Sequence, residues 1–149
     1  IRPTSRGEIN ITSKDSRVSP KIKMNYLSTQ EDRDVAAKGL KLVRKIMLET
    51  KVFAKYQPEE YRPGLHITNN EELVKAASEH SQTIFHPVGT CKMGKSDEAV
   101  VNEKLCVHGI TNLRVIDASI MPNITSGNTN APTIMIAEKG AEFILNNQK

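Results

Sequence analysis

Two short polar turns hold the side chains whose types could do chemistry. Residues 84–90 read Ile-Phe-His-Pro-Val-Gly-Thr, and residues 125–133 read Thr-Ser-Gly-Asn-Thr-Asn-Ala-Pro-Thr. Histidine is a common general base, so the imidazole of His86 can take up a proton, and the carboxamide of Asn128 can donate a hydrogen bond to an oxygen that gains charge. A lone histidine beside a proline is more often structural, so this pair needs further support.

Residues 89–96 read Gly-Thr-Cys-Lys-Met-Gly-Lys-Ser and match the two glycines and Lys-Ser of a phosphate-binding loop. The apolar run 113–117, which ends in an aspartate, could serve as the strand that holds Mg²⁺. Such a loop must follow a buried strand and open directly into a helix. Here His86 and Pro87 interrupt the preceding segment, and residues 96–103 have weak helical periodicity. We therefore do not expect a nucleoside triphosphate at this loop.

Four side chains could bind zinc, namely His86, Cys91, Cys106 and His108. Their spacings, His-x4-Cys and Cys-x-His, are unusual for zinc sites. Two cysteines do not make a disulfide framework, and small free cysteines are often core residues. We therefore expect no metal site.

Alternating polar and apolar residues predict strands in two segments, residues 7–13 and residues 21–27, with a turn between them. Residues 83–85 and 113–117 are apolar runs that predict two further short strands. If all four form, they would supply most of a largely antiparallel sheet.

Three segments have the apolar spacing of helices. The first covers about residues 30–50 after a cap at Ser28 or Thr29, the second about residues 71–81 after a cap at Asn70 or Asn69, and the third about residues 131–145. A proline in the first turn favours the start of the third helix. The segments between these helices are rich in proline, glycine and asparagine and indicate loops.

Composition limits the classes of protein. The chain has 149 residues and a formal net charge of +4, and hydrophobic residues make up 38%. The length suits one domain with a core, and no apolar run approaches the roughly 20 residues of a membrane span. Residues 1–55 are basic, but acidic residues lie among the lysines and aromatics are only 4% of the chain, so we expect no nucleic acid.

Several motifs occur together in the order and spacing of a known enzyme family. They are His-Pro-Val-Gly-Thr-Cys-Lys-Met-Gly (86–94), Val-His-Gly-Ile (107–110), Leu-Arg-Val-Ile-Asp-Ala-Ser-Ile-Met-Pro (113–122) and Ser-Gly-Asn-Thr-Asn-Ala-Pro-Thr-Ile-Met-Ile-Ala-Glu-Lys (126–139), with Ser-Arg-Gly-Glu-Ile (5–9) and Asn-Tyr-Leu (25–27) before them. The chain thus resembles the glucose–methanol–choline (GMC) flavoprotein oxidoreductases, and is most similar to their insect glucose-dehydrogenase-like branch. The resemblance covers nearly the whole chain.

The resemblance implies alcohol oxidation with FAD as the cofactor. His86 would take the hydroxyl proton while a hydride passes from carbon to flavin N5, and Asn128 would hydrogen-bond the substrate oxygen. The family has His or Asn at this second position, and an Asn cannot act as a base. The resemblance also implies which residues contact the cofactor. They are Asp117, Ala118, Thr129, Asn130, Pro132 and Thr133.

The implied fold is α+β, a largely antiparallel sheet with helices packed on one face. Residues 1–105 or so would form the substrate cap, and about 106–149 would return as a strand and helix that complete the FAD domain. No Gly-x-Gly-x-x-Gly fingerprint is present in the 149 residues. We therefore expect the C-terminal part of an enzyme that is inactive without an N-terminal FAD-binding domain.

The expected partners are that FAD-binding domain, an alcohol or sugar substrate, and a quinone or oxygen as electron acceptor. The alternative is a non-catalytic binding or scaffold fragment that lacks the flavin half. Two Asn-x-Thr sequons, at Asn10 and Asn123, are compatible with an extracellular protein but are common by chance.

Overall fold

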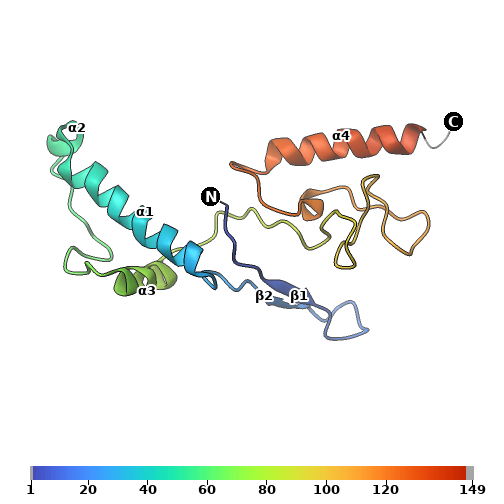
Figure 1. Ribbon diagram of the computed structural model, residues 1–149, viewed down its shortest axis with the longest axis horizontal. Helices are drawn as coiled ribbons and strands as arrows, with labels where there is room; N and C mark the ends of the chain where they lie inside the picture. Colours follow the sequence, from blue (N-terminus) through green and yellow to red (C-terminus); the bar gives the residue numbers. More distant parts are fainter. Residues whose placement is uncertain (1, 147–149) are drawn as a thin grey trace. The chain divides into compact units, whose positions relative to one another are not determined.

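The computed structural model describes residues 2–146 (Figure 1). Its contacts divide the chain into two compact units, one of residues 4–82 and one of residues 83–146 together with residues 2 and 3. The predicted boundary between substrate cap and flavin domain, near residue 105, concerns the whole protein and stays a prediction. Within the described residues, no helix combines the length and the apolar character that crossing a membrane requires.

Two strands of the first unit form an antiparallel pair, as the alternating pattern predicts. Strands β1 (Glu8–Asn10) and β2 (Lys21–Lys23) are shorter than expected, and Ile9 lies opposite Ile22 in their register. All six strand residues are exposed. A pair this short and this exposed depends on the rest of the protein for its stability.

Helices α1 (Gln30–Glu49) and α3 (Asn70–His80) pack against each other. Their contact buries Ala37 of α1 and three residues of α3, namely Leu73, Ala76 and Ala77. Three of these four side chains are alanines, which let the two backbones approach closely. A short helix, α2 (Lys51–Ala54), lies in the connector that the sequence presented as irregular.

Both packed helices begin at the caps that the sequence predicts. The Thr29 hydroxyl accepts a hydrogen bond from the Asp32 amide, and the Asn69 side chain accepts one from the Glu72 amide. In each case the donor is the third helical residue, which is the usual geometry of an N-cap.

The Asp32 carboxylate also fastens the N-terminal segment to α1. It accepts hydrogen bonds from the Thr4 and Ser5 amides, both at 2.9 Å. Partial burial raises the pKa of Asp32, but the hydrogen bonds from Ser5 and Thr4 together outweigh that effect and hold the pKa at about 2. The carboxylate is therefore charged at every pH at which the fold would normally be studied.

The expected mixture of helices and an antiparallel sheet is present, but the larger sheet with helices on one face does not form within the described residues. The described residues contain one two-stranded sheet, and their helices contact other helices rather than that sheet. Residues 83–85 are not a strand, because Phe85 has a φ of 62°, which interrupts extended backbone. Residues 113–117 form only the isolated bridge between Cys106 and Arg114.

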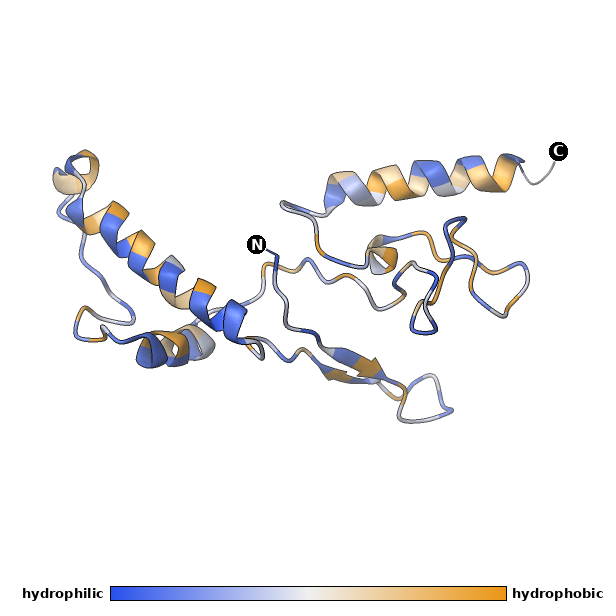
Figure 2. Cartoon of the chain, viewed as in Figure 1, coloured by the Kyte–Doolittle hydropathy of each residue, from blue (hydrophilic) through white to orange (hydrophobic). Residues whose placement is uncertain are grey.

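The second unit is built on helix α4 (Asn130–Asn146) and a 3-10 turn, η1 (Ala118–Ile120). A cluster of buried apolar residues joins them, consisting of Val101, Leu105, Ile120, Met121 and Ile136. Figure 2 shows apolar and polar residues interleaved along α4, and Ile136 is on its buried side. Gly140 is also buried, and it packs closely against Ile116. A Cβ at this position would lie 2.5 Å from Ile116 Cγ2.

Candidate functional site

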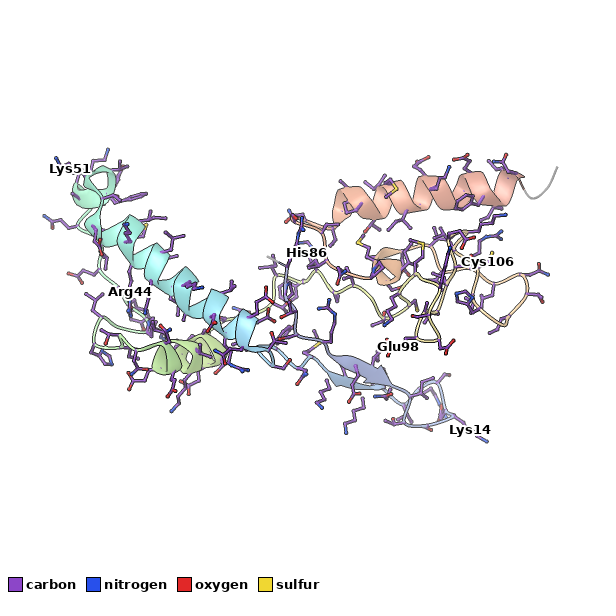
Figure 3. All side chains as sticks on the ribbon, in the orientation of Figure 1. Lys14, Arg44, Lys51, His86, Glu98 and Cys106 are labelled. Carbon is purple, nitrogen blue, oxygen red and sulfur yellow. The ribbon has the colours of Figure 1, made fainter. Side chains whose placement is uncertain are left out.

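His86 and Thr129 bring the two polar turns into contact. The ring Nδ1 of His86 lies 2.8 Å from Thr129 Oγ1, across 43 residues of sequence. Figure 3 labels His86, which lies in the second unit. The ring is half-buried and Thr129 is buried, with 8% of its surface exposed. The structure thus joins the histidine turn to the start of α4.

Backbone hydrogen bonds hold the histidine turn against η1. The Cys91 amide donates to Ser119 O at 3.0 Å, and the Met93 amide donates to Ile120 O at 2.8 Å. Gly89 has a φ of 87°, and a Cβ there would lie 3.3 Å from Met121 O. This left-handed conformation and close approach both favour glycine. The turn that carries His86 is therefore fixed to the core of its unit.

The second turn is anchored at both ends. Arg2 Nε donates to Ser126 Oγ at 2.7 Å, and the Thr133 amide donates to Thr129 O at 3.0 Å. Asn128 lies between these anchors and is exposed. Asn128 is adjacent to Thr129, the residue that touches His86. Because its side chain is exposed, it can meet a ligand near His86. Its action together with His86 on one substrate stays a prediction.

Asp117 is engaged as the cap of η1. Its Oδ1 accepts a hydrogen bond from the Ser119 amide at 2.8 Å and another from the Ser119 hydroxyl. This is the turn-forming use of an acidic residue at the end of an apolar run. Within the part of the chain that the structure describes, Oδ2 has no hydrogen-bond partner, and the side chain is exposed. Asp117 can therefore cap η1 and still accept a hydrogen bond from a ligand.

The start of α4 presents free donors. Among residues 2–146, the amides of Asn130 and Ala131 have no acceptor, and Pro132 has no amide hydrogen to donate. Thr133 is satisfied, because its hydroxyl donates to Thr129 O at 2.6 Å. Free amides and the positive end of a helix dipole suit an electron-rich group.

The structure argues against the phosphate loop. The amides that would cradle a phosphate are already used, since Cys91 and Met93 donate to η1 and Gly94 donates to Val101 O. No helix follows Ser96 before η1 in the described chain. Among the described residues, no three His, Cys, Asp or Glu side chains gather into a group that could hold a metal ion.

The family resemblance implies that Thr129 contacts the cofactor, but it does not predict the contact of Thr129 with His86. The two residues are far apart in sequence, so no local pattern predicts that they meet. One signal was available, namely the proline that stands three residues after Thr129. It removes one of the two amides that a capping hydroxyl can bind, which favours another partner for this hydroxyl.

Comparison with known proteins adds independent evidence. The family model described as GMC oxidoreductase matches residues 3–137. The oxygen-dependent choline dehydrogenase of Pectobacterium atrosepticum is 45% identical over 148 residues, which are 99% of this chain and 26% of that protein. An alcohol dehydrogenase (acceptor) of Pseudomonas putida is 47% identical over 145 residues, 97% of this chain and 26% of its own.

Solved structures agree with these sequence matches. The crystal structure of pyridoxine 4-oxidase from Mesorbium loti matches 95% of this chain and 27% of its own, with a TM-score of 0.88 and 35% identity. An FAD-dependent oxidoreductase from Chaetomium thermophilum matches 99% of this chain and 26% of its own, with a TM-score of 0.90 and 27% identity. The chain therefore spans about a quarter of the length of the relatives that it matches.

Proposed function

The chain belongs to the GMC oxidoreductase family, and from that premise we propose that the protein carrying it oxidises the CH–OH group of a small alcohol with FAD. The observation that carries the proposal is the 2.8 Å contact between His86 and Thr129, because it joins the two turns that hold the family's motifs. Because the chain is about a quarter of its relatives' length, this activity is that of the whole protein, and the chain alone would be inactive.

The described residues fit a flavin. The free amides of Asn130 and Ala131, at the positive end of α4, suit a ring edge that gains negative charge. The free oxygen of Asp117, beside Ala118, suits a hydroxyl-bearing chain. When bound, FAD supplies the acceptor for the hydride that leaves the alcohol carbon. The structural neighbours of this chain in the family are also FAD-dependent flavoproteins.

His86 would take the proton of the substrate hydroxyl, and the product would be an aldehyde or ketone. The imidazole suits this task because it can accept a proton, and its contact with Thr129 restricts the ring's orientation. Asn128 would donate a hydrogen bond to the substrate oxygen as the proton leaves and negative charge develops there. Only His86 of this pair can hold the proton, so we assign it the base role alone.

The substrate within the alcohol class is a finer proposal. The motifs resemble the insect glucose-dehydrogenase-like branch, which favours a sugar, whereas two relatives are named choline dehydrogenase and alcohol dehydrogenase. Anaerobic mixing of the complete protein with glucose, choline and a simple primary alcohol would separate these classes by the rate of flavin bleaching. Reoxidation by air or by a quinone would then identify the electron acceptor.

The base assignment is tested by His86→Gln in the complete, FAD-loaded protein. Loss of a general base typically costs about 10²- to 10⁴-fold, so we expect the rate of flavin reduction by alcohol to fall by that factor. His80→Gln is the matched control, because His80 is an exposed histidine at the end of α3. Reduction at the normal rate in His86→Gln overturns the assignment, and a complete protein that never takes up flavin overturns the proposed function.

A further inference from the structure

The Thr129 hydroxyl, just before α4, has a different hydrogen-bond partner from the capping side chains just before α1 and α3. At α1 and α3 the residue before the helix, Thr29 or Asn69, accepts a hydrogen bond from the amide three residues later. At α4 the third residue after Thr129 is Pro132. Proline has no amide hydrogen, so the capping bond of this type cannot form. The Thr129 hydroxyl is thereby left without the donor that Thr29 and Asn69 use.

Burial makes the choice of partner for this hydroxyl important. Thr129 is the one buried polar residue among those that the structure describes. A buried hydroxyl almost always has a hydrogen-bond partner, because leaving it unpaired costs free energy. In residues 2–146, the partner of the Thr129 side chain is His86 Nδ1, at 2.8 Å. The backbone carbonyl of Thr129 meanwhile accepts two hydrogen bonds from Thr133, which fix Thr129 to α4.

We propose that Thr129 is a positioning residue that accepts the Nδ1–H of His86 and so leaves Nε2 as the unprotonated ring nitrogen. This inference rests on the proposed function, because a base needs a free lone pair on the nitrogen that meets the substrate. A neutral imidazole carries one N–H, and the hydrogen bond of one nitrogen fixes the state of the other. The helix start therefore sets both the tautomer and the direction of the ring.

The test uses Thr129→Val and Thr129→Ser in the complete, FAD-loaded protein. Valine keeps the shape and removes the acceptor, whereas serine keeps the acceptor. We expect Thr129→Val to slow flavin reduction by about 10- to 100-fold, the usual cost of removing a residue that orients a reacting group. Thr129→Ser should recover the rate to within about threefold. Thr111→Val, at an exposed loop threonine of the same unit, is the control and should react normally.

A spectroscopic readout separates positioning from simple packing. In protein with ¹⁵N-labelled histidine, the ring signals of His86, assigned by their loss in His86→Gln, should show hydrogen on Nδ1 in the wild type. They should show a mixture of tautomers in Thr129→Val and recovery in Thr129→Ser. A wild-type ring with its hydrogen on Nε2, or an unchanged tautomer and rate in Thr129→Val, overturns the inference.

The two proposals fail in different ways. If the complete protein takes up no flavin, the proposed function fails. If His86→Gln reduces its flavin at the normal rate, the base assignment fails whatever the tautomer of the ring. If His86→Gln is slow while Thr129→Val matches the wild type in rate and tautomer, the base stands and only the role of Thr129 is wrong.

Discussion

A largely buried ion pair between Arg44 and Glu60 closes the connector between α1 and α3, and Glu60→Gln should lower the free energy of unfolding measurably. Arg44, labelled in Figure 3, reaches both oxygens of Glu60 at 2.7 Å and also donates to Ile67 O and Gly64 O. Glu60 in turn accepts the Gly64 amide at 3.0 Å. The two side chains are only 15% and 11% exposed. The pair therefore holds a loop of otherwise irregular chain against α1.

The expected cost lies between two known limits. Exposed ion pairs contribute about 0–1 kcal/mol, whereas removing one partner of a fully buried pair costs about 3–5 kcal/mol. Gln keeps the volume of Glu60 and one acceptor oxygen but loses the charge and one of the two acceptors for Arg44. Because a little exposure remains on both side chains, we expect about 2 kcal/mol of lost unfolding free energy.

The matched control is Asp15→Asn in the Asp15–Arg17 pair. Its nearest approach is 2.8 Å, close to that of Arg44 and Glu60, but its side chains are 42% and 88% exposed. Urea denaturation should therefore give a loss of no more than about 0.5 kcal/mol for the control. Equal losses for Glu60→Gln and Asp15→Asn would refute the claim that burial decides the strength of these pairs.

The same pair predicts a pH dependence with a definite sign. Hydrogen bonds from Arg44 hold the pKa of Glu60 below its usual range. A carboxyl with a lowered folded pKa stabilises the fold above its unfolded pKa of about 4.3, and this contribution is lost as pH falls through the folded value. Glu60→Gln has no carboxyl at this position, so its stability should fall less steeply than that of the wild type below about pH 4.

Two further predictions concern single positions in each unit. Because the pKa of Asp32 is about 2, its contribution to stability should disappear as pH falls from about 4 to 2. In Asp32→Asn, the urea midpoint should not show this loss between pH 4 and pH 2. A wild-type dependence of the midpoint on pH in Asp32→Asn would contradict the hydrogen bonds assigned to Asp32. Gly140→Ala should destabilise its unit by about 1–3 kcal/mol through overpacking against Ile116, whereas Gly39→Ala, which meets nothing within 4 Å, should stabilise α1 by about 0.5–1 kcal/mol. Thermal melts that move both glycine variants in the same direction would show that the contact at Ile116 is relieved.

Helix boundaries were predictable because their causes are local. Thr29 and Asn69 cap the amides three residues ahead, and a chain of a few residues contains all the atoms involved. The sheet was overestimated for the opposite reason. Alternation in residues 7–13 predicts a strand but says nothing of its partner, and a single left-handed residue, Phe85, ends another predicted strand. The pairing of strands and the sign of φ are decided by contacts between residues far apart in sequence, and a periodic pattern does not record those contacts.

For the site, the residue types were predictable but the contact between them was not. His86 and the turn around Asn128 were selected by their chemistry and their motifs. The hydrogen bond that joins the two turns, however, belongs to Thr129, which the sequence assigned to the cofactor instead. A hydroxyl has several possible partners within any fold, so its type alone does not identify the one that it meets.

The start of α4 shows how one position can decide both structure and chemistry. Pro132 favours the beginning of a helix because its φ is already helical, and it simultaneously removes the amide that would engage the hydroxyl of Thr129. At Thr29, where that third residue is Asp32, the same kind of hydroxyl is consumed by capping. Thr29 and Thr129 stand at equivalent positions before their helices. The third residue after each, Asp32 or Pro132, decides whether the hydroxyl caps the helix or bonds another group. A threonine before a helix with proline three residues later should therefore be considered as a side-chain partner for a distant group, here His86, before it is treated as a cap.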